Sequence, residues 1–444
     1  MKRSKTALQG YLLIAPLMIG CLLFYAIPFV LVVQYSLSTG SGDALYFIGT
    51  YNYQDVTANH MFTLAFGNTM RFLAAALPLI MVLAYLIALL MQKHADKHKL
   101  LKSVFLFPYI MPVVGAVILV ELLFAETGLV PNIASALGLP LVDWLGGPAA
   151  FGVVLLLYLW KNTGYSVILL LAGLVTIPEE QYSAADLDGA SGWQKFYYIT
   201  TPQMWYSVFF AIIFSLINAF KCFREIFLIG GTHPNENIYM LQHFLNNSFE
   251  NLNYAKLSVA SVLLLIVVLI VCDFPGKNVL LFVLMILMVL PLQVTLAPNY
   301  IMLDKLGLLD TYSALILPSI FIPLGTFILT QSFKSVSDDI IDAAKLDGCG
   351  LFRLLTKILL PMNTSGLVCV TLLSFLDGWN MVEQPIAYIK DFLRYPISVA
   401  LAYVPPADPT LQLVCCIMVV LPPLFLFTYF NRELVEGIVL AEVK

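Results

Sequence analysis

The sequence predicts an all-α, polytopic membrane protein with about ten transmembrane helices. Its 444 residues are 60% hydrophobic and only 11% charged, whereas about a quarter of the residues in a typical soluble domain are charged. The apolar residues gather in ten runs of about the length that crosses a bilayer. The formal net charge of −4 offers no basic surface for nucleic acid. These observations exclude a soluble enzyme and a nucleic-acid-binding protein.

Each apolar run is expected to form a helix, because the bilayer core has no water to satisfy the backbone polar groups. The first run follows the cationic start Met1–Lys5 and is longer than the apolar part of a signal peptide. Since no small-residue cleavage site follows it, we expect a retained anchor helix. Prolines within the runs predict kinks at Pro78, Pro108, Pro112 and Pro323. The expected spans are residues 11–37, 72–91, 103–125, 150–175, 205–228, 257–272, 278–297, 312–333, 365–388 and 411–430.

The distribution of lysine and arginine predicts the orientation of these spans. With the N-terminus in the cytoplasm, fifteen cations fall in cytoplasmic segments and only four in outer loops. Cytoplasmic loops of membrane proteins carry the excess of positive charge. We therefore expect a multi-pass protein of the cell (cytoplasmic or inner) membrane with both termini in the cytoplasm.

Two of the expected cytoplasmic loops, residues 178–202 and 337–361, are copies of an internal repeat. A constant offset of 159 brings seven identical residues together. These residues are Ala184, Ala185, Leu187, Asp188, Gly189, Ile199 and Pro202 in the first loop, and Ala343, Ala344, Leu346, Asp347, Gly348, Ile358 and Pro361 in the second. Self-similarity at a fixed offset indicates a duplicated structural unit.

The composition of both loops favours a docking element. Acidic residues open a short helix, where the positive end of the helix dipole favours them. The paired alanines give that helix a smooth face, and the glycine permits a turn that residues with a Cβ resist. The alternative is a pair of re-entry loops that lie on the lipid headgroups.

Both loops resemble the E-A-A-x-x-x-G-x(9)-I-x-L-P signature of the permease subunits of ATP-binding-cassette importers, specifically the carbohydrate branch. The resemblance implies a type I importer permease fold, in which each loop is a coupling helix that fits a cleft in a cytoplasmic ATPase subunit. The sequence departs from the signature at the leading acid, which is Ser183 in the first copy and Asp342 in the second, and at Thr201. The implied coupling residues are Glu180, Ala184, Ala185, Asp188, Gly189, Pro202, Asp342, Ala343, Ala344, Asp347, Gly348 and Pro361.

The resemblance covers nearly the whole chain and implies a fusion of two permease subunits. Leu306–Tyr312 and Gly378-Trp379-Asn380, for example, resemble the partner subunit of such systems. We expect a first permease-like unit at residues 1–272 with six helices, and a second at 273–444 with four, which lacks the first two helices of a full subunit. Three hypotheses stay open: a working compact fusion, a gene remnant, and a chain that another permease subunit completes.

Polar residues inside the spans are candidates for the solute pathway, because ionisable groups in a membrane are costly and often functional. Under the offset of 159, Arg224 lies opposite Glu383, and Asn218 opposite Asp377. Lys161, Lys221 and Glu225 are further ionisable groups in the spans, and the alternative for Lys221, Arg224 and Glu225 is that they snorkel to the outer interface. The candidate pathway residues are Glu121, Asn218, Phe220, Arg224, Asp377, Trp379, Asn380 and Glu383.

No catalytic, cofactor or metal site is expected in the chain itself. Gly276-Lys277 lacks the rest of a phosphate-binding loop, so ATP would be bound by a partner subunit. His94 and His98 lack the zinc-binding H-E-x-x-H context. We therefore expect the transmembrane permease of an ATP-driven importer for sugars or related polar solutes. Its expected partners are ATPase subunits, an extracytoplasmic solute-binding protein and the lipid bilayer. The alternatives are an ion-coupled secondary transporter, whose fold also uses internal repeats, and a non-functional remnant.

Overall fold

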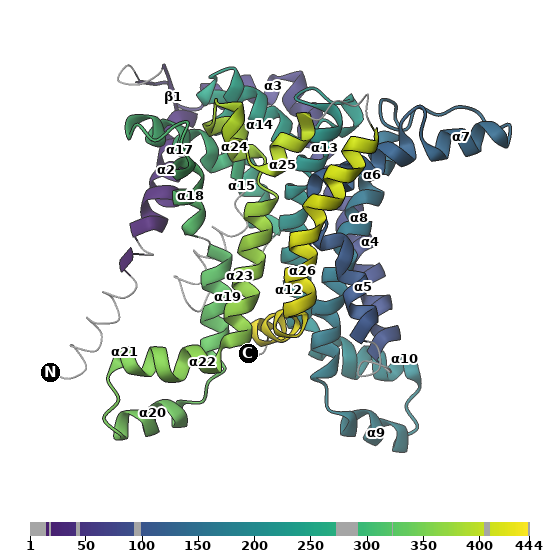
Figure 1. Ribbon diagram of the computed structural model, residues 1–444, viewed down its shortest axis with the longest axis vertical. Helices are drawn as coiled ribbons and strands as arrows, with labels where there is room; N and C mark the ends of the chain where they lie inside the picture. Colours follow the sequence, from purple (N-terminus) through teal and green to yellow (C-terminus); the bar gives the residue numbers. More distant parts are fainter. Residues whose placement is uncertain are drawn as a thin grey trace.

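The protein is an all-α assembly of long helices capped by short ones. The computed structural model describes residues 15–16, 19–40, 45–92, 99–271, 292–321, 323–403 and 409–442. Figure 1 shows long helices through the middle, short helices across the upper end, and two separate projections at the lower end. Among these residues, the only strands are β1 (Ser38–Thr39) and β2 (Tyr46–Phe47), which pair antiparallel with Ser38 opposite Phe47.

The helices up to residue 271 include all the elements that carry the first copy of the repeat. Most are α-helices; η1 and η2 are π-helices, and η3 is a 3₁₀-helix. In order they are η1 (Leu22–Ala26), α2 (Ile27–Ser36), α3 (Tyr51–Ala58), α4 (His60–Gln92), α5 (Lys99–Ile110), α6 (Val113–Phe124), α7 (Leu129–Ala136), α8 (Ala150–Val175), α9 (Glu179–Leu187), α10 (Gly192–Lys195), η2 (Phe196–Thr200), α11 (Thr201–Gln203), α12 (Trp205–Lys221), α13 (Phe223–Gly230), η3 (Glu236–Ile238), α14 (Leu241–Glu250) and α15 (Tyr254–Val271).

The helices after residue 291 repeat much of this order. Here η4 is a π-helix, and η5 and η6 are 3₁₀-helices. The elements are α17 (Leu292–Lys305), α18 (Tyr312–Ile320), α19 (Pro323–Lys334), α20 (Asp338–Leu346), α21 (Leu351–Leu354), η4 (Leu355–Leu359), α22 (Leu360–Met362), α23 (Thr364–Trp379), α24 (Glu383–Tyr388), η5 (Phe392–Arg394), α25 (Ile397–Ala400), η6 (Leu401–Tyr403) and α26 (Pro409–Glu442).

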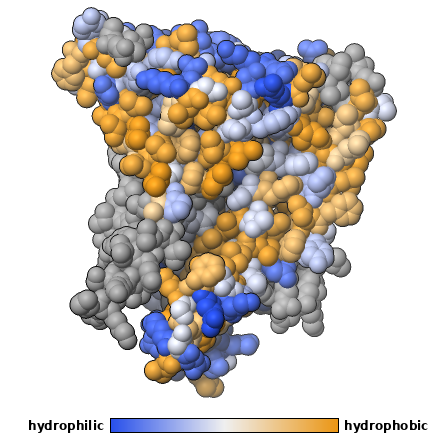
Figure 2. Space-filling model, turned by 60° about the vertical axis from the view of Figure 1, so that its left-hand side comes forward, coloured by the Kyte–Doolittle hydropathy of each residue, from blue (hydrophilic) through white to orange (hydrophobic). Residues whose placement is uncertain are grey.

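Several helices are suited to cross a membrane. Within the described ranges, five are long and apolar enough, or up to seven if each of two bent helix pairs counts as one span. The five are Ile19–Ser36, His60–Gln92, Val113–Ala136, Ala150–Val175 and Leu413–Phe430. Figure 2 shows orange apolar side chains across the middle of one face, with blue side chains at the upper end and on the lower projection. Most of the span expected at 278–297 lies outside the described residues, so the count of ten stays a prediction.

Four of the expected spans are not continuous helices. The span expected at 205–228 is interrupted at Cys222, between α12 and α13, and the span expected at 365–388 is interrupted at residues 380–382, between α23 and α24. The span expected at 103–125 is interrupted at Met111–Pro112, between α5 and α6. The span expected at 312–333 is interrupted at Phe321, between α18 and α19. Proline lacks the N–H that continues a helix, and Pro112 is the N-cap of α6 while Pro323 begins α19. The repeat-equivalent helix of the first half, α8, runs unbroken over 26 residues.

The two largest clusters of buried apolar residues lie one after the other along the same helices. The larger cluster gathers Phe72, Tyr158 and Phe220 with side chains from α14 and α15. The second gathers residues from the lower part of α4 and α8 with others from α5, α12 and α23. Helices α5 and α8 approach so closely at Gly164 that a Cβ there would lie 1.7 Å from the carbonyl oxygen of Phe105. Small residues at such crossings allow membrane helices to pack backbone to backbone.

The first helix that the structure describes packs against residues from the later part of the chain. The ring of Phe24 in η1 stacks on Phe321 with 5.8 Å between ring centroids. The amide of Asn299 in α17 donates a hydrogen bond to the carbonyl oxygen of Phe24 at 3.4 Å. A Cβ at Gly20 would clash with the Phe321 ring. Residues near the start of the chain thus fasten directly to helices that follow residue 291.

Candidate functional site: two elbows and a charged cavity

The two repeated loops form matching elbows at the lower end of the molecule. Helices α9 and α20 hang below the remaining helices, each followed by a second short helical segment (Figure 1). Each begins with two acidic residues, Glu179 and Glu180 in α9 and their counterparts Asp338 and Asp339 in α20. Acidic side chains in the first turn are stabilised by the helix dipole. The loops therefore fold as the repeat predicted, into helix–turn–helix elbows.

The turn that follows each of these two helices uses glycine in a left-handed conformation. Gly189 and Gly348 have φ angles of +73° and +75°. In both elbows the following N–H bonds back over the turn, from Ala190 to Ala185 at 2.9 Å and from Cys349 to Ala344 at 3.0 Å. This pattern satisfies the last carbonyl groups of the helix, and glycine is the residue that adopts its φ without strain.

Equivalent apolar side chains are exposed on both elbows. Leu187 and Leu346 are 91% and 89% exposed, and Trp193 and Phe352 are 72% and 73% exposed. Ala184 and Ala343 lie on the exposed side, whereas Ala344 is buried. Of the other residues implied by the signature, Ala185 is half-buried, and the rest are exposed: Glu180, Asp188, Gly189, Pro202, Asp342, Asp347, Gly348 and Pro361. Each elbow thus presents leucine among carboxylates, away from the body of the protein.

Each elbow continues into a core helix through the same distorted segment. The π-helices η2 and η4 are one repeat offset apart, and each precedes a proline, Pro202 or Pro361. The chain then bends by 68° into the helices that include α12, and by 79° into α23. Sharp bends in helices arise at proline and at π-bulges, which are frequent at functional sites. Helices α12 and α23 therefore connect the elbows to the centre of the molecule.

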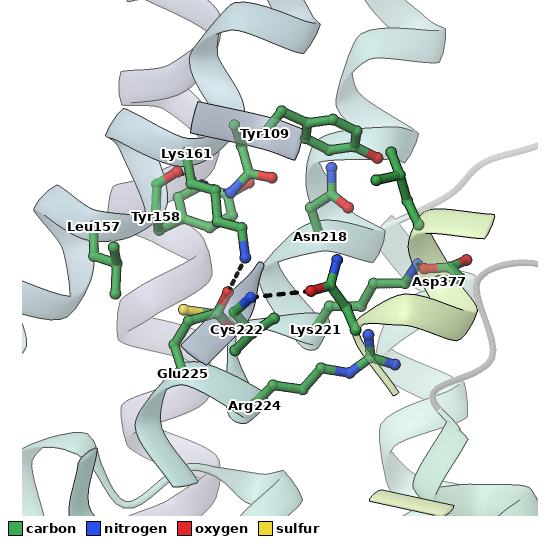
Figure 3. A pocket seen from close by; sticks show the side chains of 14 residues that line it. Tyr109, Leu157, Tyr158, Lys161, Asn218, Lys221, Cys222, Arg224, Glu225 and Asp377 are labelled. Atoms are coloured by element: carbon green, nitrogen blue, oxygen red, sulfur yellow. Dashed lines mark hydrogen bonds and ion pairs between the residues drawn. The ribbon is translucent and has the colours of Figure 1, made fainter. Parts of the chain in front are cut away.

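A small polar cavity lies at the far ends of α12 and α23. Its volume is about 60 Å³, whereas pockets for organic ligands usually measure about 300–1,000 Å³. Its lining residues are Tyr109, Val113, Leu157, Tyr158, Lys161, Asn162, Asn218, Lys221, Cys222, Arg224, Glu225, Leu376, Asp377 and Asn380. Figure 3 shows these side chains converging from several helices. The cavity is polar enough to hold a few water molecules and too small for a sugar.

Three ion pairs organise this region. Nζ of Lys161 lies 2.6 Å from Oε1 of Glu225, and Nζ of Lys221 lies 2.6 Å from Oδ1 of Asp377 (Figure 3). Nε of Arg224 donates to both carboxylate oxygens of Glu383, at 2.8 and 3.1 Å. The Arg224 and Glu383 side chains are only 10% and 3% exposed, so this pair is well buried. Six charged groups therefore neutralise one another pairwise.

The pairing follows the internal repeat. Arg224 and Glu383 are separated by 159 residues, which is the repeat offset, so they occupy equivalent positions. Two equivalent residues touch one another only near the axis that relates two units. The same offset relates Lys221 to Asn380 and Asp377 to Asn218, and all four line the cavity. The charged centre therefore lies where the two repeats meet.

The structure separates the candidate pathway residues into two groups. Asn218, Arg224, Asp377 and Asn380 line the cavity, and Oδ1 of Asn380 accepts the backbone N–H of Val113 at 3.0 Å. The other four are not among its lining residues. Phe220 belongs to the larger apolar cluster, and Nε1 of Trp379 donates a hydrogen bond to the carbonyl oxygen of Val419. Glu383 contacts the cavity only through its ion pair with Arg224. Glu121 lies in α6 and is not part of the lining.

Sequence reasoning missed part of the lining and misjudged one alternative. Arg224 and Glu225 are 8% and 5% exposed, so the idea that they snorkel to an interface was wrong for them. Tyr109, Tyr158 and Asn162 were not recognised as lining residues, since nothing in an apolar helix pattern marks which face a polar group takes. The pair Lys161–Glu225 could have been predicted from the sequence, because a buried charge is costly unless a group of opposite charge lies beside it.

The comparisons with known proteins agree with this architecture. The family described as "Binding-protein-dependent transport system inner membrane component" matches residues 97–276 and again 273–432. The chain belongs to this family. Because the family matches twice, this permease is a fusion of two permease units. The family is one of transport components, not of enzymes.

The permease is similar to sugar permeases in sequence and to an importer in fold. It is 30% identical over 274 residues to the trehalose/maltose transport system permease protein MalF of Thermococcus litoralis, over 60% of this chain and 92% of MalF. It is 29% identical over 177 residues to the arabinooligosaccharides transport system permease protein AraQ of Halalkalibacterium halodurans, and so spans only 63% of AraQ. A crystal structure of a bacterial ABC transporter that imports alginate matches with a TM-score of 0.53 and 22% identity, over 61% of this chain and 94% of that one.

Proposed function

We propose that this permease is the membrane component of an ATP-driven importer of carbohydrates or related polar solutes, driven by separate ATPase subunits that dock on α9 and α20. The observation that carries the proposal is the pair of equivalent elbows, each exposing a leucine among carboxylates and each continuing into a central helix. In each elbow the exposed leucine is accompanied by a second exposed apolar residue at the equivalent position, Trp193 or Phe352. Exposed apolar side chains that gather in this way support a surface that a partner covers. ATP binds to the partner, and the permease performs no chemistry of its own.

The proposal also includes the orientation of the protein and its division into two units. With the elbows facing the ATPases, the lower end of Figure 1 is cytoplasmic, and the end of α26 lies on that side. The upper end then faces an extracytoplasmic solute-binding protein. The two units are residues 1–272 and 273–444, whose boundary lies outside the described residues. The second unit lacks two helices of a full subunit. A compact fusion should transport solute without another permease subunit, a chain completed by another permease subunit should transport only with it, and a remnant should not transport at all.

The chemistry of the cavity supports a polar, uncharged solute. Asn162, Asn218 and Asn380 offer amide groups toward it, while the charged groups already neutralise one another. Amides and paired charges can exchange hydrogen bonds with hydroxyl groups without leaving a buried ion unpaired. The printed names of the trehalose/maltose and arabinooligosaccharide permeases support a solute of the carbohydrate class.

The decisive experiment removes the exposed leucines. We expect the double variant Leu187→Asp/Leu346→Asp to fold normally and to lose at least about tenfold in co-purification with ATP-binding-cassette subunits, because acidic groups replace the apolar anchors. The matched control is Leu393→Asp, since Leu393 is 88% exposed at the upper end. Undiminished ATPase recovery with the double variant would overturn the proposal. So would solute uptake that survives loss of ATP and collapses with an ionophore.

A further inference from the structure

We propose that the two ion pairs that join the repeats, Lys221–Asp377 and Arg224–Glu383, form a lock that holds the solute pathway closed. The third pair, Lys161–Glu225, lies within the first repeat and is not part of the lock. The lock would open when the repeats separate, and closing would re-form it. That ATPases drive the opening of the lock rests on the proposed docking of ATPase subunits at the elbows. That the two ion pairs close the pathway does not depend on this docking.

The first step of the argument is that the cavity cannot transmit a solute as it stands. Its volume of about 60 Å³ is several times smaller than an ordinary ligand pocket. Lys221, Arg224 and Asp377 are part of its wall, and Figure 3 shows Lys221 extended toward Asp377 across the cavity. Any solute that crosses here must therefore displace these side chains.

The second step is that only two of the three pairs bridge the repeats. Lys221 and Arg224 belong to α12 and α13 of the first repeat, while Asp377 and Glu383 belong to α23 and α24 of the second. Both members of the Lys161–Glu225 pair belong to the first repeat, on α8 and α13. If the repeats move apart as units, the first two pairs break and the third moves as a whole.

The third step is a mechanical connection to the elbows. Asp377 lies in the last turn of α23 and Lys221 is the final residue of α12, and these are the helices that follow the two elbows. A helix of 17 residues such as α12 is about 25 Å long. A movement of either elbow is thus carried by a rigid element to one member of an inter-repeat pair.

The fourth step is that the charged groups can find other polar partners when the ion pairs separate. Asn218 and Asn380 are the repeat-equivalents of Asp377 and Lys221, and they line the same cavity. The Lys221–Asp377 side chains are 34% and 39% exposed even in the closed form, so water can reach them. Amides and water can solvate the separated charges, which keeps the cost of opening below that of an ion pair buried without alternatives.

Cys222 supplies a native reporter of opening. It lines the cavity and is only 4% exposed. We would purify the full chain in lipid nanodiscs with Cys222 as its single cysteine and measure the rate at which a small water-soluble maleimide labels it. The lock variants are Asp377→Asn and Glu383→Gln, which remove one charge with little change of shape. The matched control is Asp55→Asn, which breaks the Lys256–Asp55 pair within the first repeat, away from the residues that line the cavity.

We expect each lock variant to raise the labelling rate of Cys222 by about tenfold, and the control to change it by less than about twofold, because only the lock variants weaken the closed state. The charge exchange Arg224→Glu/Glu383→Arg should return the rate to near that of the unaltered chain. If Glu383→Gln does not fold, Asp377→Asn carries the test, since its pair is half-exposed. Equal labelling in the lock variants and the unaltered chain would overturn the lock, as would an equal rise in the control.

The lock and the proposed function can fail separately. The labelling experiment needs no ATPase, so its result stands whether or not the elbows bind one. Conversely, the lock variants leave the elbows unaltered and should still recover ATP-binding-cassette subunits as the unaltered chain does. Loss of this recovery in the lock variants would overturn the assignment of these residues to gating alone, because it would tie them to docking.

Discussion

The carbonyl oxygen of Phe105 in α5 lies against Gly164 in α8, where an added Cβ would be 1.7 Å from that oxygen. Backbone atoms cannot yield as a flexible side chain can, so we expect Gly164→Ala to separate the two helices. The loss should be at least about 2–3 kcal/mol in the free energy of unfolding. Gly152 is the control, because it lies in the same helix and its Cβ would meet nothing within 4 Å. Thermal unfolding in detergent should show Gly152→Ala neutral or slightly stabilising; equal melting of both variants would contradict the close contact.

The two elbow glycines should matter for docking more than for stability. Proline at either position would fix φ near −65° and remove an N–H that now donates to Asp186 or Lys345. We expect Gly189→Pro/Gly348→Pro to lose co-purification with ATPase subunits while the melting temperature shifts by only about 2 °C, because both turns lie outside the core. Asparagine tolerates positive φ, so the corresponding Asn pair should retain most of the binding. Retained binding in the proline pair would argue against docking at these turns.

Asp310 should stabilise the loop between α17 and α18 in a pH-dependent way. Its Oδ1 accepts the backbone N–H groups of Asp391 and Lys390, each at 3.0 Å, and these bonds lower the pKa of Asp310. A carboxylate with a lowered pKa contributes stability above its unfolded value of about 3.9 and loses it as the pH falls through the folded value. Asp310→Asn should therefore melt earlier than the unaltered chain at pH 7, and the difference should shrink toward pH 3. A difference independent of pH would show that the charge is not responsible.

His243 should make the protein sensitive to acid. It is fully buried in α14, and burial, with a smaller effect of His233, lowers its pKa to about 3. Below about pH 6.5 the unfolded chain binds a proton that the folded protein does not, so the free energy of unfolding falls with pH. Between pH 6.5 and 5 this loss is about 2 kcal/mol. His243→Gln keeps an acceptor for the N–H of Met240 and should melt with less dependence on pH over this range; an unchanged dependence would assign it to other groups.

The repeat allowed the elbows to be predicted and left the centre only partly predicted. Helices α9 and α20 lie where the acids, alanines and glycines placed them, because these signals are local. The offset also brought Arg224 opposite Glu383, and the structure pairs them. It placed Asn218 opposite Asp377, but the partner of Asp377 is Lys221, one turn further along α12. An offset identifies equivalent positions, whereas contacts across an axis depend on the distance of each residue from that axis.

The interruptions at Met111–Pro112 and Phe321 were not predicted as helix ends. Proline in an apolar run is compatible with either a kink or a break, and α4 continues through Pro78. Which one occurs depends on whether neighbouring helices satisfy the freed carbonyl groups, and this is a property of the packed structure. The hydropathy of 103–125 and 312–333 therefore gave their length correctly but not their continuity.

The stacking of Phe24 on Phe321 has a consequence for biosynthesis. The second ring is added 297 residues after the first (321 − 24), which at about 5–20 residues per second takes roughly 15–60 s of translation. Until then the leading helix has inserted without the surface that will receive it. A polypeptide released from the ribosome before residue 321 would leave Phe24 facing lipid or a quality-control protease. The packing of the first described helix is therefore completed only by a segment made much later in translation.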